Sequence, residues 1–550
     1  MPPFLQHHHL TLTPLSPIHL GTGEDYEPTN YVISDGLLYT FDPAQADLNP
    51  TQRKDLWEAA QSGDIFRIQN FFKNHPEPFI GCAHNIVAIT QNLAKEYETK
   101  LGKTVQREAH GKRVSNQLEI KRTAANPQTH RPYIPGSALK GCLRTALLER
   151  LIQGQRDAVE GYGAKAKLNE TALLGSFASD GLRLLKTADL MPSEDAATQI
   201  LYSVNHKKRQ PKTGENNSGG VTTRCETIRH AQYRAFSGTF ALQHLNLAHQ
   251  PQIKDPQKSL PSANAQPKSL QQLAQDTNAY HIKRFTQEIG LLKSRGLAKE
   301  SWLQSVEQLL AKLMPQLNQG RIMLIRLGKF GGAEYKTLDG LAQIKIMQGK
   351  GTPPKFEART KTIWLAAESE RQADNLLPFG WTLIEIDPQG DNSDIQNWCR
   401  TYGSHLSNDR ELRQKWQQQK AAVQEAKAAA AQAAKAEAEA QRRQAEAQAA
   451  TEAARQAELA AMNPAERIAA EWHDKLTAFT FDSRNQQAHT ELYQQLTAAL
   501  QQATAELTTA EQKQLAETLS FKAMQSKQPQ LFAGKREKEI KALLKTLRGE

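Results

Sequence analysis

The sequence is short of the residues that several common kinds of site require. Only four of its 550 residues are cysteine, and Cys82, Cys142, Cys225 and Cys399 form no CxxC pair. This spacing excludes a zinc ribbon and offers no disulfide framework of a secreted domain. No stretch reaches the roughly 18 apolar residues of a membrane-spanning helix, and no apolar block follows the first residues as in a signal peptide. We therefore expect a cytoplasmic protein with reduced thiols and no membrane partner.

Two phosphate-binding fingerprints are also missing. Neither GxxxxGK[ST] nor GxGxxG occurs, so a P-loop and a dinucleotide site have no support. Aromatic residues make up only 7% of the chain, and no RNP-type aromatic pair is present. Stacking on bases should therefore be secondary to phosphate contact in any RNA binding. We expect no cofactor and no metal site, and we interpret Glu24 and Asp25 as a solvated pair.

What the chain has in excess is positive charge. Its formal net charge is +11, which indicates a polyanionic partner. Residues 1–410 carry 49 Lys and Arg against 40 Asp and Glu, whereas residues 411–550 carry 20 against 18. Basic stretches cover residues 100–131 and 203–234. Nucleic acid, if bound, should therefore contact the first 410 residues.

Apolar patterning predicts a mixture of strands and helices in residues 1–400. Asp35-Gly36 between two apolar runs predicts a hairpin, because both turn positions require positive φ. The patterns also predict helices over 51–72, 137–152, 278–295 and 301–317, strands over 9–15, 235–242, 321–327 and 381–386, and loops over 203–224 and 250–272. This order is typical of an α+β protein.

The composition changes after residue 406. Alanine supplies 20 of residues 421–460, mixed with Glu, Gln, Lys and Arg, which is the most helix-favouring mixture. Val423 and Leu459 are its only larger aliphatic residues, so we expect a solitary helix rather than a coiled coil. Capping boxes begin at Asn463 and Thr508 and precede apolar stripes, which predicts a small C-terminal helical bundle.

Three motifs bring a family into view: PIHLGTGE at 17–24, YIPGSALKGCLRTA at 133–146, and LGKFGG at 327–332, followed by Lys336 and Thr337. In this order, the chain resembles RAMP proteins of type III CRISPR systems, over about residues 8–390. Within the family it is most similar to the type III-A (Csm) subunit that caps the 3′ end of the guide RNA. The alanine-rich helix and the C-terminal bundle lie outside the resemblance.

The resemblance implies the fold and the partners. It implies ferredoxin-like, RRM-related RAMP domains over residues 1–220 and 221–405, to which the sequence adds a helical linker at 406–461 and a helical domain at 462–550. The implied partners are single-stranded crRNA and the other subunits of the complex, with a host nuclease as a further partner in guide maturation. The implied role is an RNA-binding subunit of a ribonucleoprotein rather than an enzyme.

The same motifs supply the candidate RNA-binding residues. The turn at Gly136 and Ser137 exposes amide groups at a helix N-terminus, and Lys140 and Arg144 extend that site by one turn. The alternative interpretation, without RNA binding, is a helix cap followed by two solvated charges. The complete set of candidates is Gly21, Gly23, Gly136, Ser137, Lys140, Arg144, Arg326, Gly328, Lys329, Gly331 and Lys336.

Two other functions stay open. A metal-independent endoribonuclease that processes CRISPR repeat RNA needs a general acid or base, and His19 is the candidate, although a lone histidine in a strand is more often structural. A docking scaffold would use the C-terminal domain to recruit a maturation nuclease or another subunit.

Overall fold

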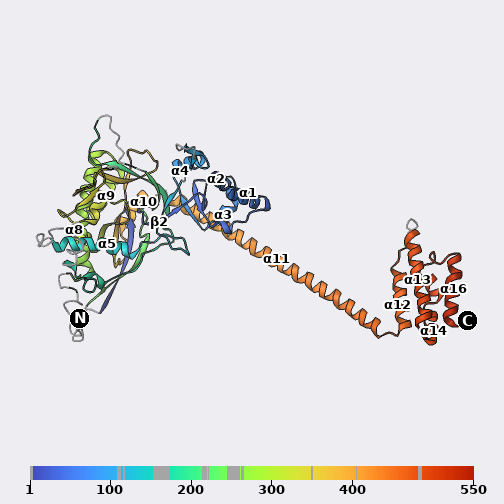
Figure 1. Ribbon diagram of the computed structural model, residues 1–550. Coiled ribbons are helices and arrows are strands. Elements are labelled where there is room, and N and C mark those ends of the chain that lie inside the picture. Colours follow the sequence, from blue (N-terminus) through green and yellow to red (C-terminus); the bar gives the residue numbers. More distant parts are fainter. Residues whose placement is uncertain are drawn as a thin grey trace. The chain divides into compact units, whose positions relative to one another are not determined.

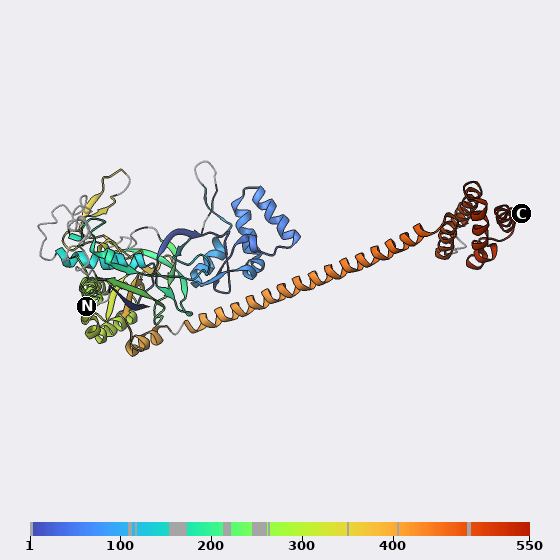
Figure 2. The ribbon, with the colours of Figure 1, turned by 90° about the horizontal axis from the view of Figure 1, so that it is seen from below.

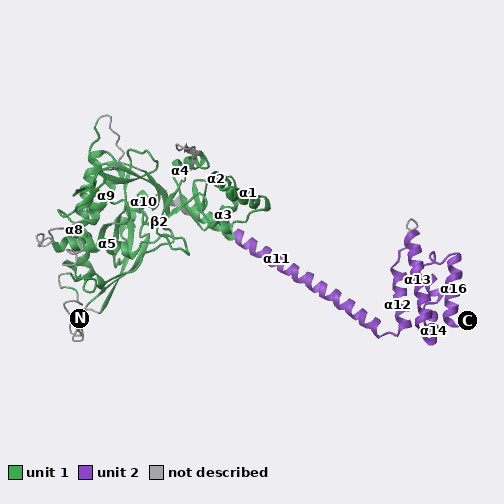
Figure 3. Cartoon of the chain, viewed as in Figure 1, with its two compact units in different colours: residues 1–421 green, residues 422–550 purple. Residues whose placement is uncertain are grey.

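The computed structural model divides the chain into two compact units (Figures 1 and 3). Unit 1 is Met1–Ala421 and unit 2 is Ala422–Glu550. The structure describes residues 4–107, 113–115, 118–152, 173–212, 220, 222–244, 261, 265–348, 351–403, 406–480 and 486–550. Parts of the basic stretches and of the expected loop at 250–272 lie outside these residues. Within the described ranges, no helix combines the length and the apolar character needed to cross a membrane.

The first sheet of unit 1 joins strands from distant parts of the chain. Its order is β10-β13-β1-β19-β14, and β9 pairs with β13. β1 is the central strand, because Leu10 pairs with both Gly238 and Ile386 in antiparallel register. The bounds are β1 (Leu5–Pro14), β9 (Leu185–Thr187), β10 (Met191–Pro192), β13 (Phe236–Gln243), β14 (Ile322–Arg326) and β19 (Trp381–Ile386).

The second sheet has the order β2-β8-β12-β11-β5-β4-β3, and β17 and β18 extend it from β11. Ile18, between β1 and β2, bridges Ile228, so this segment links the two sheets. The bounds are β2 (Gly21–Tyr26), β3 (Tyr31–Ser34), β4 (Leu37–Thr40), β5 (Asn85–Ala88), β8 (Ile120–Thr123), β11 (Thr198–Lys207), β12 (Thr223–Ile228), β17 (Thr362–Ala367) and β18 (Leu377–Pro378). Two hairpins stand apart: β6 (Thr104–Arg107) with β7 (Arg113–Ser115), and β15 (Ile344–Ile346) with β16 (Lys355–Glu357).

Helices cover these strands on their apolar sides. α8 and α9 pack on β14, and α5 packs on α8. A second group, α1 to α3, lies beside β3 and β4 over a cluster of Phe41, Phe71, Phe72 and Phe79 (Figures 1 and 2). The bounds are α1 (Pro50–Gln61), α2 (Ile65–Asn74), α3 (Pro76–Cys82), α4 (Gln91–Lys100), α5 (Gly136–Ile152), α8 (Leu270–Arg295), α9 (Glu300–Asn318) and α10 (Ser393–Tyr402).

The α+β class predicted from the sequence is confirmed. The hairpin at Asp35-Gly36 joins β3 to β4, with φ of 51° and 74° at the two turn residues. The helix expected over 51–72 is interrupted, because Gly63 adopts a φ of 62° between α1 and α2. Parts of the expected loop at 203–224 are strand, since β11 extends to Lys207 and β12 begins at Thr223.

α11 (Leu406–Ala461) begins in unit 1. Trp416 packs against the phenylalanine cluster, Arg413 donates to the carbonyl of Ile86 at 3.2 Å, and Lys420 donates to the carbonyl of Ala83 at 2.8 Å. From residue 421 to 458 every side chain is exposed. The helix therefore becomes a solvated spacer after residue 421, later than the predicted boundary at 406.

Unit 2 contains five further helices whose apolar residues share one core, which includes Trp472, Leu496 and Phe532. The predicted capping boxes are present, Asn463 with Glu466 and Thr508 with Glu511. The bounds are α12 (Pro464–Ala478), α13 (Gln486–Glu506), α14 (Thr509–Thr518), α15 (Phe521–Lys527) and α16 (Lys535–Arg548).

Candidate nucleic-acid interface

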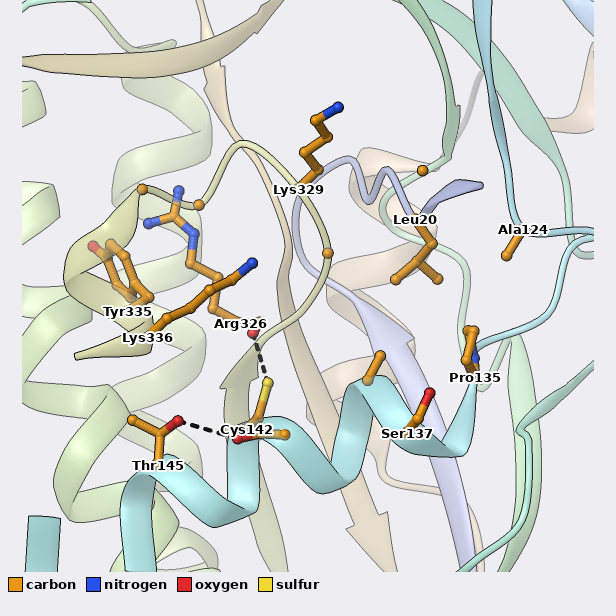
Figure 4. A pocket seen from close by; sticks show the side chains of 16 residues that line it. Leu20, Ala124, Pro135, Ser137, Cys142, Thr145, Arg326, Lys329, Tyr335 and Lys336 are labelled. Atoms are coloured by element: carbon orange, nitrogen blue, oxygen red, sulfur yellow. Dashed lines mark hydrogen bonds between the residues drawn. The ribbon is translucent and has the colours of Figure 1, made fainter. Parts of the chain in front are cut away.

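The three sequence motifs meet around one pocket of unit 1, which has a volume of about 610 Å³ (Figure 4). α5 forms one wall, and the segment after β14 forms the opposite wall. The start of β2 and the end of β8 complete the rim through Gly21 and Ala124. Seven of the predicted residues line it: Gly21, Ser137, Arg326, Gly328, Lys329, Gly331 and Lys336.

The wall formed by α5 is made of small side chains. Ser137, Gly141 and Thr145 follow each other at four-residue spacing and line the pocket. Leu139 and Leu143 face the other way and are buried in the core of the unit. Because the pocket face carries no long side chain at these positions, a ligand can approach the helix closely. The predicted binding face, at Lys140 and Arg144, lies one residue away, which on a helix is a rotation of about 100°.

Gly328 and Gly21 allow the first and third motifs to touch. Gly328 has a φ of 84°, and a Cβ there would lie 2.4 Å from the carbonyl oxygen of His19. The amide of Lys329 donates to that same oxygen at 2.8 Å. A Cβ at Gly21 would lie 3.1 Å from Nε2 of His19. Glycine is therefore required here for close approach of two backbone segments, which places Lys329 at the rim.

The cations of the pocket are Lys329 and Lys336, both exposed. Within the described residues neither amino group has a hydrogen bond or an ion pair, and no carboxylate lines the pocket. The nearby Glu334 is engaged elsewhere, since its carboxylate accepts from Lys208 at 2.6 Å and from the hydroxyl of Thr360 at 2.7 Å. The rim is therefore positive and open to an anion.

Four predicted residues lie outside the pocket. The ammonium of Lys140 donates to the carbonyl of Leu185 at 3.0 Å, and burial lowers its pKa. Arg144 forms an ion pair with Asp180 at 2.6 Å. Gly23 lies in the exposed part of β2 with open space around its Cα.

Gly136, the fourth, has a packing role. Its amide donates to the carboxylate of Asp189 at 2.8 Å, so this end of α5 already has an anionic partner. A Cβ at Gly136 would lie 2.7 Å from the carbonyl oxygens of Thr187 and Ala188. The amide of Gly136 is therefore occupied by the fold itself.

Arg326 touches the pocket but belongs to the core. Its guanidinium forms a buried ion pair with Glu288, and its Nε donates to the carbonyl of Phe379 at 2.8 Å. Glu288 also accepts from the hydroxyl of Tyr335 at 2.5 Å and from the indole of Trp381 at 3.0 Å. The charge of Arg326 is thus neutralised by the fold and is not available to an anion in the pocket.

His19 is fully buried between the two sheets. Its Nδ1 donates to the carbonyl of Glu226 at 2.8 Å, and its ring stacks on Phe330 at 5.4 Å. Burial lowers the pKa of His19 to about 4, so the ring is neutral at neutral pH. A side chain with no exposed surface and this pKa is a poor general acid or base for RNA.

Cys142, Thr145 and Tyr335 also line the pocket and were not among the predicted residues. The thiol of Cys142 donates to the carbonyl of Arg326 at 3.0 Å, and burial raises its pKa to about 12, so it is not a nucleophile. The four-residue spacing of Ser137, Gly141 and Thr145 was the available signal. No comparable signal marks Tyr335, whose position follows from its bond to Glu288.

No group of three or more His, Cys, Asp or Glu side chains that could hold a metal ion occurs among the described residues. Glu24, one of the two acidic residues considered for a cation, instead pairs with Arg122 at 2.9 Å.

Comparisons with known proteins agree with the resemblance found in the motifs. Residues 11–224 match the model of the RAMP superfamily. The "CRISPR system Cms protein Csm5" of Mycobacterium tuberculosis, strains CDC 1551 / Oshkosh and ATCC 25618 / H37Rv, is 28% identical over 157 residues. This match covers 27% of the chain and 40% of the relative, so the chain spans about two fifths of the length of the curated relatives it matches.

Two solved structures show a weaker likeness. A chain of the "Csm-crRNA-target RNA ternary complex in type III-A CRISPR-Cas system" has a TM-score of 0.39 and 16% identity, covering 69% of this chain and 100% of that one. Csm5 of T. onnurineus has a TM-score of 0.39 and 16% identity, covering 68% and 99%. The family match includes two of the three motifs, so residues 11–224 are similar to the RAMP superfamily, and the chain is similar to the Csm5 proteins named above.

Proposed function

We propose that this chain is an RNA-binding subunit of a type III-A CRISPR interference complex that holds the crRNA near its 3′ end. The observation that carries the proposal is the meeting of three distant motifs at one pocket that no carboxylate lines, with Lys329 and Lys336 unpaired at its rim. The other subunits of the complex are partners in this proposal. A nuclease docked by unit 2 is not part of it, because nothing in the described residues favours one.

The pocket suits an RNA backbone better than a particular base. Two ammonium groups attract phosphate without regard to sequence, and a guide-holding subunit must accept any spacer. The small side chains of α5 and the glycines opposite let a phosphodiester lie close to the protein backbone. In this proposal unit 1 contains RAMP domains of the ferredoxin-like kind, related to the RRM, which binds single-stranded RNA on its sheet.

The proposal is tested by measuring the RNA affinity of a variant that lacks both lysines of the pocket. We expect Lys329→Ala with Lys336→Ala to weaken binding of crRNA-like RNA in a gel shift or anisotropy titration. The slope of log K against log salt should fall by about 1.4, because single strands release about 0.7 counterion per phosphate contact. The control pair is Lys54→Ala with Lys312→Ala, two exposed lysines on α1 and α9. Equal affinity of the pocket variant and wild type would refute the site.

The proposed role is non-catalytic. Burial of His19 and its lowered pKa argue against the endoribonuclease, since the ring cannot reach a 2′-hydroxyl from its present position. The same titration, run with repeat-containing RNA in EDTA and in Mg²⁺, should leave the RNA intact. Specific cleavage in EDTA that His19→Ala abolishes would overturn this part of the proposal.

A further inference from the structure

A second concentration of positive charge lies in unit 1 where α11 begins. Its members come from four separate segments of the chain and are partly buried. We call them the junction cluster: His84, Arg122, His130, Arg131, Arg413 and Lys420.

Contacts hold these side chains together. The rings of His84 and His130 stack at 3.8 Å between centroids. The guanidinium of Arg122 lies 4.9 Å from the ring of Tyr26, on the strand that neighbours β8. Arg413 and Lys420 are two turns apart on one face of α11, and each donates to a backbone carbonyl next to β5 or in it. The first turns of α11 therefore add two cations to a surface that already has them.

Carboxylates compensate only part of this charge. The buried Glu226 interacts electrostatically with Arg122 and Arg413. Arg122 pairs with Glu24 at 2.9 Å. In the described part of the chain, no carboxylate forms an ion pair with Arg131, Arg413 or Lys420. Arg131 instead donates to the carbonyl of Ser193.

The two histidines have lowered pKa values and are neutral at neutral pH, so the positive charge of the junction cluster comes from Arg122, Arg131, Arg413 and Lys420. Burial lowers the pKa of His84 to about 4, and His130, Lys420 and Arg122 lower it further. Burial lowers the pKa of Arg413 as well, the carboxylate of Glu226 raises it, and the neighbouring Arg131 lowers it. Partly buried cations that repel each other are unfavourable unless an anion is bound among them.

β8 connects the junction cluster to the pocket. Ala124, which directly follows β8, lines the pocket, and Arg122 on β8 belongs to the cluster. Two residues of a strand span about 7 Å, close to the spacing of successive phosphates in an extended single strand. Lys121 precedes Arg122 on β8, and its charge helps to lower the pKa of His19. β8 therefore carries two cations, Lys121 and Arg122, within three residues of the pocket lining.

We propose that the junction cluster is a second phosphate-binding surface for the same RNA, continuous with the pocket through β8 and completed by the start of α11. The inference rests on the proposed function, because it takes the same ligand. It gives the first turns of the alanine-rich helix a role in RNA binding. The chemistry it recognises is the phosphodiester backbone, without base preference.

The experiment compares three full-length variants with the wild type in titrations of single-stranded crRNA-like RNA at several salt concentrations. Arg413→Gln with Lys420→Gln removes the two charges while keeping donors for the carbonyls of Ile86 and Ala83. Lys415→Gln with Lys435→Gln is the matched control, since both lysines are exposed on the same helix. Lys329→Ala with Lys336→Ala reports on the pocket independently.

We expect the junction variant to bind about tenfold or more weakly at 0.1 M salt, with a slope lower by about 1.4, and the control pair to bind as the wild type does. Hydrogen exchange on the wild type gives a second readout, in which RNA should protect residues 82–90 and 411–421. Unchanged affinity and slope in the junction variant, with no protection of these segments, overturn the inference.

The two proposals fail separately. If the pocket variant loses affinity and the junction variant does not, the inference is wrong and the proposed function stands. If the wild type does not bind the RNA, the proposed function fails and the inference fails with it. Loss of a protein subunit from the assembled complex, with RNA affinity intact, would show that the cluster serves a protein and overturn the inference.

Discussion

Arg326 and the pair Lys329 and Lys336 lie within eleven residues of each other, yet the fold treats their charges in opposite ways. The side chain of Arg326 is 1% exposed and its partner Glu288 is 4% exposed, and further hydrogen bonds hold the pair. Lys329 and Lys336 are exposed at the rim of a pocket that no described carboxylate lines.

The contrast shows that the density of Lys and Arg in a sequence is a poor guide to a binding surface. What matters is whether the fold supplies a partner. By this criterion Lys140 and Arg144 belong with Arg326, because Lys140 donates to a backbone carbonyl and Arg144 pairs with a carboxylate of the same chain. Lys329 and Lys336 are left for a ligand. Two changes test this division between charges that hold the fold and charges that face outward, and a third tests the buried layer that surrounds Arg326.

The largest effect is expected at Arg326. Arg326→Met leaves the carboxylate of Glu288 buried without its cation, and we expect a loss of about 3–5 kcal/mol in the free energy of unfolding. Urea unfolding followed by tryptophan fluorescence measures it, since Trp381 packs against this ion pair. Arg326→Met combined with Glu288→Gln should recover part of the loss. A stability close to wild type in the single variant would mean that the ion pair does not hold the fold.

The loop that carries Lys329 is the next test. Gly328→Ala needs a Cβ 2.4 Å from a carbonyl oxygen at a φ of 84°, so it should cost about 1–3 kcal/mol and weaken RNA binding by displacing Lys329. Gly23→Ala is the matched control, with a φ of 91° but no atom within 4 Å of the added Cβ. It should lose less stability and keep RNA affinity. Equal effects of the two variants would show that the contact with His19 does not position the loop.

The smallest effect concerns His281, which packs edge-on to Trp381 in the same buried layer. Both ring nitrogens are buried without a hydrogen-bond partner in the described structure. Burial also lowers the pKa of His281 to about 3. His281→Leu removes these unsatisfied groups at similar volume, and we expect a gain of about 1–2 kcal/mol at neutral pH.

The lowered pKa of His281 also predicts how the free energy of unfolding changes with pH. Between about pH 6.5 and pH 3 the unfolded chain binds a proton at His281 and the folded chain does not, so this residue makes stability fall as the pH falls. The leucine variant should therefore lose less stability than wild type between pH 7 and pH 5 in urea unfolding. An equal or larger loss in the variant would contradict the assigned pKa.

The sequence predicted local structure well where the pattern was local. The hairpin at Asp35, the helix beginning at Gly136 and the capping boxes at Asn463 and Thr508 depend on neighbours in the chain, and all are present. Pairing over long distances was not predictable. β1 pairs with strands more than 200 residues away, and an alternating pattern does not encode its partners.

The site was predictable for the same reason only in part. The motifs located the pocket. No sequence pattern, however, identifies Glu288 of α8 as the residue that neutralises Arg326. The face of α5 was assigned to its charged residues, although small residues line the pocket. Arg413 and Lys420 were hidden within what looked like a uniform linker, because nothing local distinguishes a helix turn that packs from one that is solvated.

The exposed stretch of α11 has a consequence for how this chain can change over generations. The side chains of residues 421–458 are exposed and belong to neither core, and Arg455 pairs with Asp474 of α12. Insertions and deletions between residues 421 and 454 should therefore leave both cores intact. Each residue inserted into or deleted from a continuous helix rotates the residues that follow by about 100° about the helix axis and shifts them by about 1.5 Å along it. Length variants should therefore survive in steps of about 18 residues, or five full turns, if orientation matters to function, and at any length if it does not.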